Sequence, residues 1–455
     1  QLKRALLHAS TRFELEKKLY NTYKEVKLLA ETDSLTGLSN RYIFDESLKK
    51  ILSVDCRCEQ KVGLLLFDLD DFKLVNDTFG HDVGDLLLKK VVARIKGCLR
   101  GNETFARLGG DEFAIMLSNL TTSDDAGQVA RRIVSVLYKP FEIALTSIQT
   151  TVSLGIAFYP ENGLTSEVLF KHADIAMYRA KKLGKNQICF FEEEMQKKFQ
   201  DRVRIETELK CAIEKKQFQL HYQPIINPKN KKLLGFEALI RWYVDGKLRC
   251  PDEFINIAEE TGQIISIGAW VIEEAISTLA QWHKKYNSKL TMAINISAHQ
   301  LSDPTLVKSL SDCLIKHKIP AALIDIEITE TALLKDTTET HNALIGLSDL
   351  NCRLSLDDFG TGFSSISHLR NYPISVVKID KSLIPEDQAD KKKIALMEGL
   401  VSMASILGLE VIAEGVETHY QVSLCQLFNI LHVQGYYYSK PLSKQDIERT
   451  FLTSL

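Results

Sequence analysis

The sequence lacks long hydrophobic runs, an excess of either charge, and the glycine and proline content of low-complexity chains. Its 455 residues include 23 glycines and 10 prolines, too few for a collagen-like or disordered chain. No stretch of about 18 apolar residues occurs, so the sequence predicts no membrane-spanning helix. The 57 basic and 59 acidic residues leave a net charge of −2, which argues against a nucleic-acid binder that works by neutralising phosphates. The 45% of hydrophobic and 25% of charged residues are typical of a globular protein, and the length predicts two or three domains.

Cysteine is sparse and does not occur in paired motifs. The nine cysteines are spread along the chain without any C-x-x-C sequence. An odd count of this kind fits a reducing compartment better than a disulfide framework or a zinc site. The chain starts at Gln1 inside a helical pattern, without a Met or a signal peptide. We therefore expect a cytoplasmic protein, or the cytoplasmic portion of a larger sensor protein.

The first 32 residues predict a helix. From residue 2 onward this segment contains no glycine or proline, and its apolar residues recur at alternating steps of four and three. This seam consists of Leu15, Leu19, Thr22, Val26 and Leu29. The spacing favours a parallel coiled coil that makes a homodimer, and the alternative is an amphipathic helix docked on its own domain.

Two larger domains follow. Residues 33–191 alternate strands and helices, with strands expected at 61–68 and 151–158, a hairpin across 104–117, and helices at 83–99 and 172–182. Residues 192–216 are highly charged and predict a helical linker that runs into the second domain at 200–455. That domain contains eight short apolar strands, most of them separated by helical stretches, which predicts a (β/α)₈ barrel. The expected strands are 218–225, 234–240, 291–296, 324–329, 353–358, 376–380, 409–414 and 432–438. The fold class is therefore two-domain α/β.

Each predicted barrel strand carries a polar residue at or near its end. These residues are Gln223, Glu237, Asn295, Glu327, Asp357 with Asp358, Lys378, Glu414 and Gln434. Strand ends converge on one face of such a barrel, where bare carboxylates would repel one another. Carboxylate and amide oxygens favour Mg²⁺ or Mn²⁺, and two such ions can activate a water for in-line phosphoryl displacement. The alternative for any single residue is a loop cap or a structural salt bridge.

The second domain resembles the EAL family of cyclic di-GMP phosphodiesterases. The resemblance rests on Glu-Ala-Leu-Ile-Arg-Trp at 237–242 and on further motifs in the same order. These are Gln-Pro-Ile at 223–225, Asn-Ile-Ser at 295–297, Glu-Ile-Thr-Glu at 327–330, Asp-Asp-Phe-Gly-Thr-Gly at 357–362, Lys-Ile-Asp at 378–380, Glu-Gly-Val-Glu at 414–417 and Gln-Gly-Tyr at 434–436. The family has one barrel strand antiparallel to the others, and its product is the linear dinucleotide pGpG.

The EAL resemblance also implies a role for each matched residue. The first metal ion would be held by Glu237, Asn295, Glu327 and Asp357. The second would be held at Asp357 and Asp358, with Glu414 also in the metal set. Lys378 and Glu414 would prepare the attacking water. Gln223, Arg241 and Gln434 would contact the substrate, and Glu330 would anchor the loop after Asp358.

In the first domain, Asp68 ends a predicted buried strand and Asp111 lies in a Gly-Gly turn. Two such carboxylates could hold Mg²⁺ against a triphosphate, while the alternative is ordinary capping and turn chemistry. The surrounding motifs resemble the GGDEF family of diguanylate cyclases. They are Arg-Leu-Gly-Gly-Asp-Glu-Phe at 107–113, Asp-Ser-Leu-Thr-Gly-Leu-Ser-Asn-Arg at 33–41, Asp-Leu-Asp-Asp-Phe-Lys at 68–73, Gly-His-Asp-Val-Gly-Asp at 80–85 and Lys-Lys-Leu-Gly-Lys-Asn at 181–186.

The GGDEF resemblance implies a GTP site with one or two metal ions. Asp68, Asp111 and the carbonyl of Leu69 would bind metal, and Glu112 would help to activate the 3′-hydroxyl. Asn76 and Asp85 would read the guanine edge. The phosphates would be held by the backbone N–H groups of Asp71 and Phe72 and by Lys181 and Lys185.

Two positions depart from the GGDEF pattern. The inhibitory product site needs Arg-x-x-Asp, and here Arg100 is followed by Glu103, a longer acid. Lys185 replaces a common Arg and offers the phosphate a point charge instead of a bidentate fork.

The sequence thus predicts a bifunctional homodimer that makes cyclic di-GMP from GTP and hydrolyses it to pGpG. One alternative is a phosphodiesterase whose first domain binds GTP only as an activator. Another is a receptor that binds cyclic di-GMP without turnover, although receptors of this type typically lose metal-binding residues and none is missing here.

Overall fold

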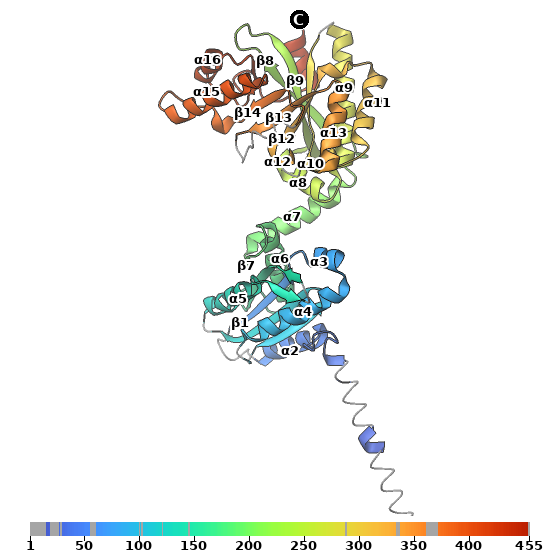
Figure 1. Cartoon of the computed structure of the whole chain (residues 1–455), viewed down its shortest axis with the longest axis vertical. Helices are drawn as coiled ribbons and strands as arrows, with labels where there is room; N and C mark the ends of the chain where they lie inside the picture. Colours follow the sequence, from blue (N-terminus) through green and yellow to red (C-terminus); the bar gives the residue numbers. More distant parts are fainter. Residues whose placement is uncertain are drawn as a thin grey trace, which may run out of the picture. The chain divides into compact units, whose positions relative to one another are not determined.

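The computed structural model describes residues 15–18, 27, 30–54, 61–99, 101, 103–120, 122–143, 146–286, 289–333, 337–360 and 372–453. The chain divides into two compact units, residues 1–201 and 202–455 (Figure 1). The boundary falls inside helix α7, Glu193–Leu209.

The predicted coiled coil falls mostly outside the described residues. Leu15 is described and 64% exposed, whereas Leu19, Thr22, Val26 and Leu29 are among the residues that the structure does not describe. The heptad seam and the dimer that it favours therefore stay predictions.

The first unit is a sheet with helices on both faces. Its elements are α2 (Arg41–Val54), β1 (Lys61–Leu69), α3 (Phe72–Phe79), α4 (His81–Lys96), β2 (Thr104–Gly109), β3 (Glu112–Leu120), α5 (Ser123–Leu137), β4 (Phe141–Ile143), β5 (Thr146–Ile148), β6 (Val152–Tyr159), α6 (Ser166–Lys182) and β7 (Ile188–Phe190). Within the described residues the main sheet has the order β2-β3-β1-β6-β7, in which only the β6–β7 pair is parallel. The predicted strands, the hairpin and both helices are present, but α6 begins earlier than expected because Thr165 caps it at Val168.

Strand β1 is the centre of this unit. Its apolar run is buried on both faces, as expected for a central strand covered by two layers of helices. Leu64 and Leu66 pack with residues of α2 and α6, while Leu65 and Phe67 pack with residues of α4 and α5. The strand therefore ends at a fixed place, and Asp68 is fixed with it.

The second unit is a closed barrel. Its strands are β8 (Phe218–Ile226), β9 (Leu233–Val244), β10 (Lys247–Arg249), β11 (Thr291–Asn295), β12 (Ile324–Thr329), β13 (Arg353–Phe359), β14 (Val376–Ile379), β15 (Glu410–Ala413), β16 (His432–Val433) and β17 (Leu442–Ser443). Its helices are α8 (Pro251–Glu260), α9 (Ile264–Tyr286), α10 (Ala298–Leu301), α11 (Leu306–His317), α12 (Glu330–Leu333), α13 (Thr338–Asp349), α15 (Lys391–Ile406), α16 (His419–Leu427) and α17 (Lys444–Ile447), and a π-helical turn covers Glu448–Leu452.

Eight of the described strands close the barrel: β8, β9 and β11 to β16. The strands β9 and β11 to β16 pair in parallel, and β8 pairs antiparallel with both β9 and β16. The antiparallel strand that the family resemblance implied is therefore β8. Because β9 continues to Val244, Glu237 lies in its middle and not near its end.

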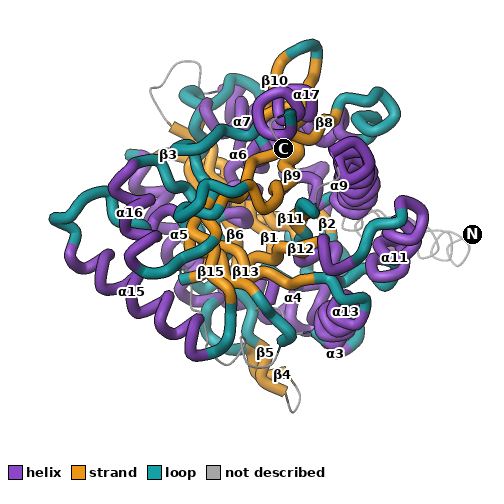
Figure 2. Tube along the Cα trace, turned by 90° about the horizontal axis from the view of Figure 1, so that it is seen from above, coloured by secondary structure: helices purple, strands orange, loops and turns teal. Residues whose placement is uncertain are grey.

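Helices cover the outside of the barrel in two groups. Helices α9, α11 and α13 lie side by side on one flank, and α15 and α16 lie on the other (Figures 1 and 2). In the part of the chain that the structure describes, α9 is the one helix long and apolar enough to cross a membrane, and half of its most apolar window is buried. Its buried face, which includes Ile272, Ile276 and Leu279, packs into the barrel core and accounts for the apolar composition.

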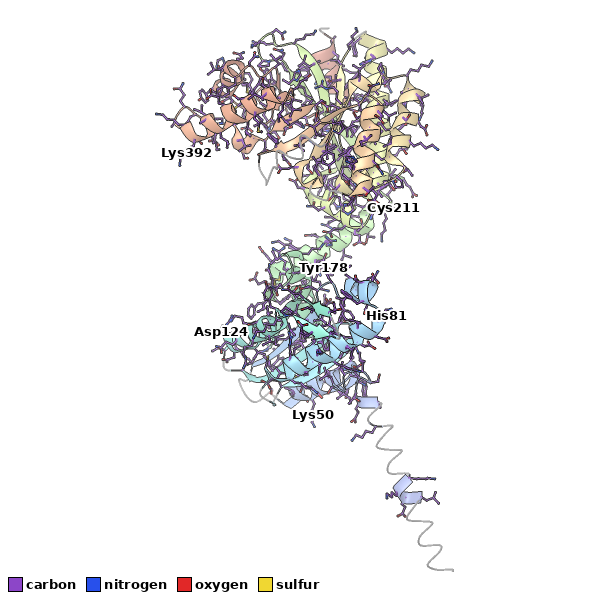
Figure 3. All side chains as sticks on the ribbon, viewed as in Figure 1. Lys50, His81, Asp124, Tyr178, Cys211 and Lys392 are labelled. Atoms are coloured by element: carbon purple, nitrogen blue, oxygen red, sulfur yellow. The ribbon has the colours of Figure 1, made fainter. Side chains whose placement is uncertain are left out.

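Helix α7 packs at both of its ends. In its first half, Phe199 makes an edge-on contact with Tyr178 of α6, with ring centroids 5.6 Å apart; Tyr178 is labelled in Figure 3. Near its end, Ile205 and Leu209 are buried in the barrel core. Apolar packing at each end explains why this highly charged segment is an ordered helix.

Candidate active sites

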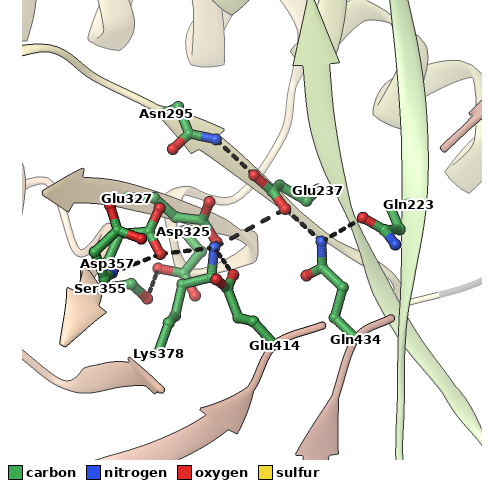
Figure 4. A network of polar contacts seen from close by, with 11 residues as sticks. Gln223, Glu237, Asn295, Asp325, Glu327, Ser355, Asp357, Lys378, Glu414 and Gln434 are labelled. Atoms are coloured by element: carbon green, nitrogen blue, oxygen red, sulfur yellow. Dashed lines mark hydrogen bonds and ion pairs between the residues drawn. The ribbon is translucent and has the colours of Figure 1, made fainter. Parts of the chain in front are cut away.

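The barrel site is organised around one buried lysine. The ammonium of Lys378, on β14, lies 2.7 Å from Glu327 and 2.6 Å from Glu414 (Figure 4). It also lies 3.5 Å from Asp357 and 3.9 Å from Glu237. The side chain of Lys378 is completely buried. One cation thus faces carboxylates from β9, β12 and β13 and from the residue after β15.

A chain of amide side chains holds Glu237 from the other side. Asn295 donates to one Glu237 oxygen at 2.6 Å, and Gln434 donates to the other. Gln434 also reaches Gln223 Oε1 at 3.0 Å, and Gln223 lies directly across the β8–β9 ladder from Glu237. All four side chains were predicted from sequence, and Figure 4 shows them converging. Their hydrogen bonds fix the orientation of the Glu237 carboxylate.

Electrostatic coupling separates the pKa values of the buried acids. Burial raises the pKa of Glu237, but Lys378 and the bonds from Gln434 and Asn295 bring it below its usual value. Burial, and then the charge of Glu237, raises the pKa of Glu327 well above its usual value. Burial raises the pKa of Glu414 to about 8 despite the opposing charge of Lys378. For Lys378 itself burial acts downward, and the carboxylates overcome it and raise the pKa well above that of a free lysine.

This donor set fits divalent metal ions. In the described residues, Lys378 is the only cation that reaches the buried Glu327 carboxylate, which accepts no hydrogen bond. Asp357, Asp358 and Glu414 bring carboxylate oxygens within 4.8 Å of one another. Oxygen ligands without thiolate or imidazole suit Mg²⁺ or Mn²⁺. The predicted first set would hold one ion through Glu237 and Glu327, and the cluster at Asp357 would hold the second.

The turn after β13 is conformationally constrained. Asp358 has φ 55°, in the left-handed region, and its N–H donates to Asp357 Oδ1 at 3.0 Å. Gly360 has φ 93°, and a Cβ there would meet Leu383 at 2.7 Å, so a glycine is required. The loop that follows, 361–371, lies outside the described residues. Glu330 begins α12 next to this site, and its predicted role as the anchor of that loop stays a prediction.

A cleft of about 850 Å³ opens beside Glu237 and Asn295. Its wall includes the apolar side chains of Leu239 and Ile240 and the N-terminal half of α9, as well as Asn256 and His299, two polar residues that sequence reasoning missed. Arg241 is less directly placed: its guanidinium donates to the carbonyl of Ile240 at 2.8 Å, and burial lowers its pKa while Glu237 opposes that shift. The structure thus brings Arg241 within electrostatic range of Glu237.

Asp68 and Asp111 form the corresponding centre in the first unit. Burial, and then the charges of Asp111 and Glu112, raises the pKa of Asp68 to about 6, although Lys181 opposes the shift. The Lys181 ammonium lies 2.8 Å from Asp68, and Glu112 lies directly across the β1–β3 ladder from it. Asp68, which is predicted to bind metal, and Lys181, which is predicted to bind phosphate, are therefore neighbours. Leu69 ends β1 beside them.

The turns that carry the predicted phosphate-binding residues are tied together by Asp70, whose role sequence reasoning missed. Its buried carboxylate accepts from Thr151 and Ser153, each at 2.6 Å, and from the backbone N–H of Asn186 at 3.1 Å. These bonds hold the turn that carries Lys185 against the end of β1. Lys185 reaches Asp71 at 2.7 Å, and Asp71 itself precedes Phe72, the first residue of α3.

The predicted guanine-reading residues lie on two helices that come close together at a glycine. Asn76 lies on α3 and Asp85 on α4, where it is exposed. A Cβ at Gly84 would meet Asn76 Oδ1 at 2.0 Å, so α4 can approach the amide only with glycine at this position. The close approach places Asn76 against the start of α4, which also carries Asp85.

Arg107 closes the Gly-Gly turn. Its guanidinium donates to the Gly110 carbonyl at 2.9 and 2.7 Å and to both Asp33 oxygens at 3.1 and 3.2 Å. Gly110 has φ 56°, a conformation that favours glycine. Arg107 thus fixes the turn that presents Asp111. Arg100 lies outside the described residues, so the modified inhibitory site at Arg100 and Glu103 stays a prediction.

Comparison with known proteins defines the class of each unit. The family model described as "Diguanylate cyclase, GGDEF domain" matches residues 30–187, and the EAL domain model matches residues 206–441. The chain therefore belongs to the GGDEF–EAL tandem family, whose members turn over cyclic di-GMP. EAL domains generally depend on metal ions, in keeping with the acidic cluster in the barrel.

Individual relatives extend over both units. The chain is 39% identical to the signaling protein YkoW of Bacillus subtilis over 95% of its own length and 54% of that protein. It is 36% identical to the bifunctional diguanylate cyclase/cyclic di-GMP phosphodiesterase MucR of Pseudomonas aeruginosa, over 93% of this chain and 62% of MucR. The structure of the MucR phosphodiesterase in complex with c-di-GMP covers 54% of this chain and 99% of its own, with a TM-score of 0.51 and 33% identity. The chain thus spans little more than half the length of these two relatives.

Proposed function

We propose that the barrel hydrolyses cyclic di-GMP to pGpG with two Mg²⁺ or Mn²⁺ ions. The observation that carries the proposal is the cluster of buried carboxylates around Lys378, which is complete in every predicted member. When bound, the metal ions would activate a water and stabilise the oxygens of the phosphate that is displaced.

This chain's own residues would orient that chemistry. Asn295 and Gln434 hold the Glu237 carboxylate in place, and Gln223 holds Gln434. Lys378 and Glu414 form a direct ion pair of 2.6 Å and would order the attacking water beside them. The cleft lined by Leu239 and Ile240 offers the nucleotide an apolar wall, and Arg241 would supply a positive charge to a phosphate.

We further propose that the first unit joins two GTP molecules into cyclic di-GMP, at a lower rate than hydrolysis. In this proposal 33–191 is the cyclase domain, 200–455 the phosphodiesterase domain and 192–216 the helical linker between them. Asp68 and Asp111 would hold the metal ions, Asn76 and Asp85 the guanine, and Lys181 and Lys185 the phosphates. A cyclase needs two loaded domains face to face, so synthesis requires a homodimer.

Substitution of Leu19 and Val26 by charged residues should then lower both the dimer fraction in sedimentation and GTP turnover. An unchanged dimer would place the interface elsewhere.

An alternative role for the first unit is GTP binding without synthesis, as an input that accelerates hydrolysis. It is favoured by the contacts of both proposed phosphate-binding lysines with carboxylates, Lys181 with Asp68 and Lys185 with Asp71. It is also favoured by the chemistry of Lys185, which offers the phosphate a point charge in place of the bidentate fork of an arginine. In either version the upstream signal would come from a sensor that precedes this part of the chain.

The deciding experiment is nucleotide turnover by the purified protein, supplied with GTP and with cyclic di-GMP separately. Release of pGpG that requires Mg²⁺ or Mn²⁺ supports the phosphodiesterase. Binding of cyclic di-GMP without turnover at saturating Mn²⁺ would instead favour the receptor. Product from GTP supports synthesis, and faster hydrolysis in GTP without product supports the activator.

A further inference from the structure

A second group of metal-ligating side chains lies on the outside of the barrel, on α9 and α11. Cys313 and His317 are one helical turn apart on α11, so both project from the same face of that helix. Glu273 of α9 faces them. The Glu273 carboxylate lies 3.4 Å from the Cys313 sulfur and 2.8 Å from His317 Nε2, and the three ligand atoms lie within 4.8 Å of one another.

We propose that Glu273, Cys313 and His317 bind one Zn²⁺-class transition metal ion that cross-links α9 to α11. This site is separate from the catalytic carboxylates and does not depend on the proposed function. Thiolate and imidazole ligands select zinc and its neighbours over Mg²⁺. The site therefore differs in chemistry from the oxygen-only cluster in the barrel.

The distances fit such an ion with little movement. Zn–S bonds of about 2.3 Å and Zn–O and Zn–N bonds of about 2.0–2.1 Å place tetrahedral S···O ligand pairs roughly 3.5 Å apart and N···O pairs roughly 3.3 Å apart. The observed sulfur–carboxylate separation of 3.4 Å already agrees, and the imidazole need only withdraw from its 2.8 Å hydrogen bond. The site has three protein ligands, which leaves one position for water or a further ligand.

The group lies at the surface of the barrel unit, where it is partly exposed and Lys316 competes for one of its ligands. Cys313 is buried, and the His317 side chain is 18% exposed. Burial, and then the bond to Glu273, raises the pKa of the Cys313 thiol to about 12, so the thiol proton occupies the place between sulfur and carboxylate that the ion would take. Lys316 pairs with the same Glu273 oxygen as His317, at 2.5 Å, but its side chain is 62% exposed and free to swing into solvent. Lys316 therefore competes with the metal for Glu273.

The site is also connected to the substrate cleft through α9. Ile267 and Val271, on the turns of α9 before Glu273, line that cleft. An ion that ties Glu273 to α11 would hold this wall of the cleft to the neighbouring helix. We therefore expect metal binding to raise the thermal unfolding temperature of the protein, as any ligand of the folded state does.

Co²⁺ is the probe, because a cobalt–thiolate bond gives a near-ultraviolet charge-transfer band that oxygen-only sites lack. The full-length protein is first saturated with Mg²⁺ and then titrated with Co²⁺. We expect a thiolate band that saturates at one ion per chain, is displaced by Zn²⁺, and is lost in Cys313→Ser. His317→Gln should weaken binding by about 10-fold or more, on the scale of losing one ligand contact. Lys316→Gln should bind more tightly than the wild type, since it removes the competitor.

Two outcomes would overturn the proposal. One is the absence of a thiolate band in the wild type. The other is a band that persists unchanged in Cys313→Ser, which would place the ion on another cysteine. Should Cys313→Ser fail to fold, Glu273→Gln, at a half-exposed position, serves in its place and should also lose tight binding. Far-ultraviolet circular dichroism and cooperative thermal unfolding in Mg²⁺ check that each variant is folded, and neither readout requires that the barrel be active.

Discussion

The two candidate active sites place carboxylates in different environments. In the barrel, Glu237, Glu327 and Lys378 are buried and compensate one another in the interior of a closed sheet. In the first unit, Asp68 lies at a strand end, and its partner Lys181 keeps 34% of its side chain exposed. The lysine–carboxylate contacts have nearly the same length, 2.7 Å in the barrel and 2.8 Å in the first unit. Because their burial differs, we expect their loss to have different effects on the free energy of unfolding. The carboxylates of the barrel site are thus compensated by a fully buried cation, whereas the counter-ion of Asp68 remains partly in contact with solvent.

The largest expected effect comes from removing the best-oriented carboxylate. Glu237→Ala should lower the kcat of cyclic di-GMP hydrolysis by roughly 10³-fold or more, because it removes a metal ligand and leaves Asn295 and Gln434 without their acceptor. GTP binding should be unchanged. Steady-state release of pGpG at saturating Mn²⁺ measures the effect. Glu410→Gln, at the other end of β15 from Glu414, is the control and should keep most of the activity.

A large effect on stability is expected for Lys378→Met. When a chelator removes the metal ions, the variant has no cation beside the carboxylates that Lys378 faces. This should lower the free energy of unfolding by about 3–5 kcal/mol. Mg²⁺ should restore part of the loss, since the ions supply the missing positive charge. Denaturant titration with and without Mg²⁺ tests both statements. Lys381→Met, which breaks the solvent-exposed pair with Glu417, should leave the free energy of unfolding nearly unchanged. Equal losses for the two variants would contradict the importance of burial.

An intermediate effect is expected for the guanine contact. Asp85→Ala should weaken GTP binding by about 1.5–3 kcal/mol, the range for a hydrogen bond to a charged group, and leave hydrolysis without GTP unchanged. If GTP accelerates hydrolysis, Asp85→Ala should also abolish that acceleration.

Asp111→Ala should abolish synthesis while it keeps much of the guanine contact. Calorimetry on both variants separates the roles, and a wild type that binds no GTP at millimolar concentration would leave the first unit a structural domain.

The smallest effect is expected for Lys181→Met, the counterpart of Lys378→Met in the first unit. Because the pair with Asp68 is partly exposed, its loss should change the free energy of unfolding by about 0–1 kcal/mol. GTP affinity should still fall, since a phosphate contact is removed. Denaturant titration and GTP calorimetry on the same sample measure the two effects. A destabilisation as large as that of Lys378→Met would mean that the two sites are equally dependent on internal ion pairs.

Local patterns predicted the elements well, because each strand and helix carries its own periodicity. Seven of the eight barrel strands were expected near their observed bounds, and so was the strand that includes Asp68, whereas the strand expected at 432–438 is limited to His432–Val433, so Gln434 follows it. The predictions were less accurate where an element's end depends on its partners. Strand β9 continues past Glu237 because it pairs with both β8 and β10, and α6 begins earlier because of a cap at Thr165.

The sequence by itself determined which side chains are available: the ordered motifs, the oxygen-rich donor set and the boundaries of hydrophobic runs are all properties of neighbouring residues. Only the tertiary structure decided their contacts, because those join residues far apart in the chain. It places Lys378 among acids of three other strands and of the residue after β15. It also makes Asp70 the anchor of the turn at Lys185, and uses Arg107 to hold the turn at Asp111. It also brings Glu273 of α9 to the face of α11 that carries Cys313 and His317. The absence of paired cysteines in the sequence argued against such a group, because its third ligand comes from another helix.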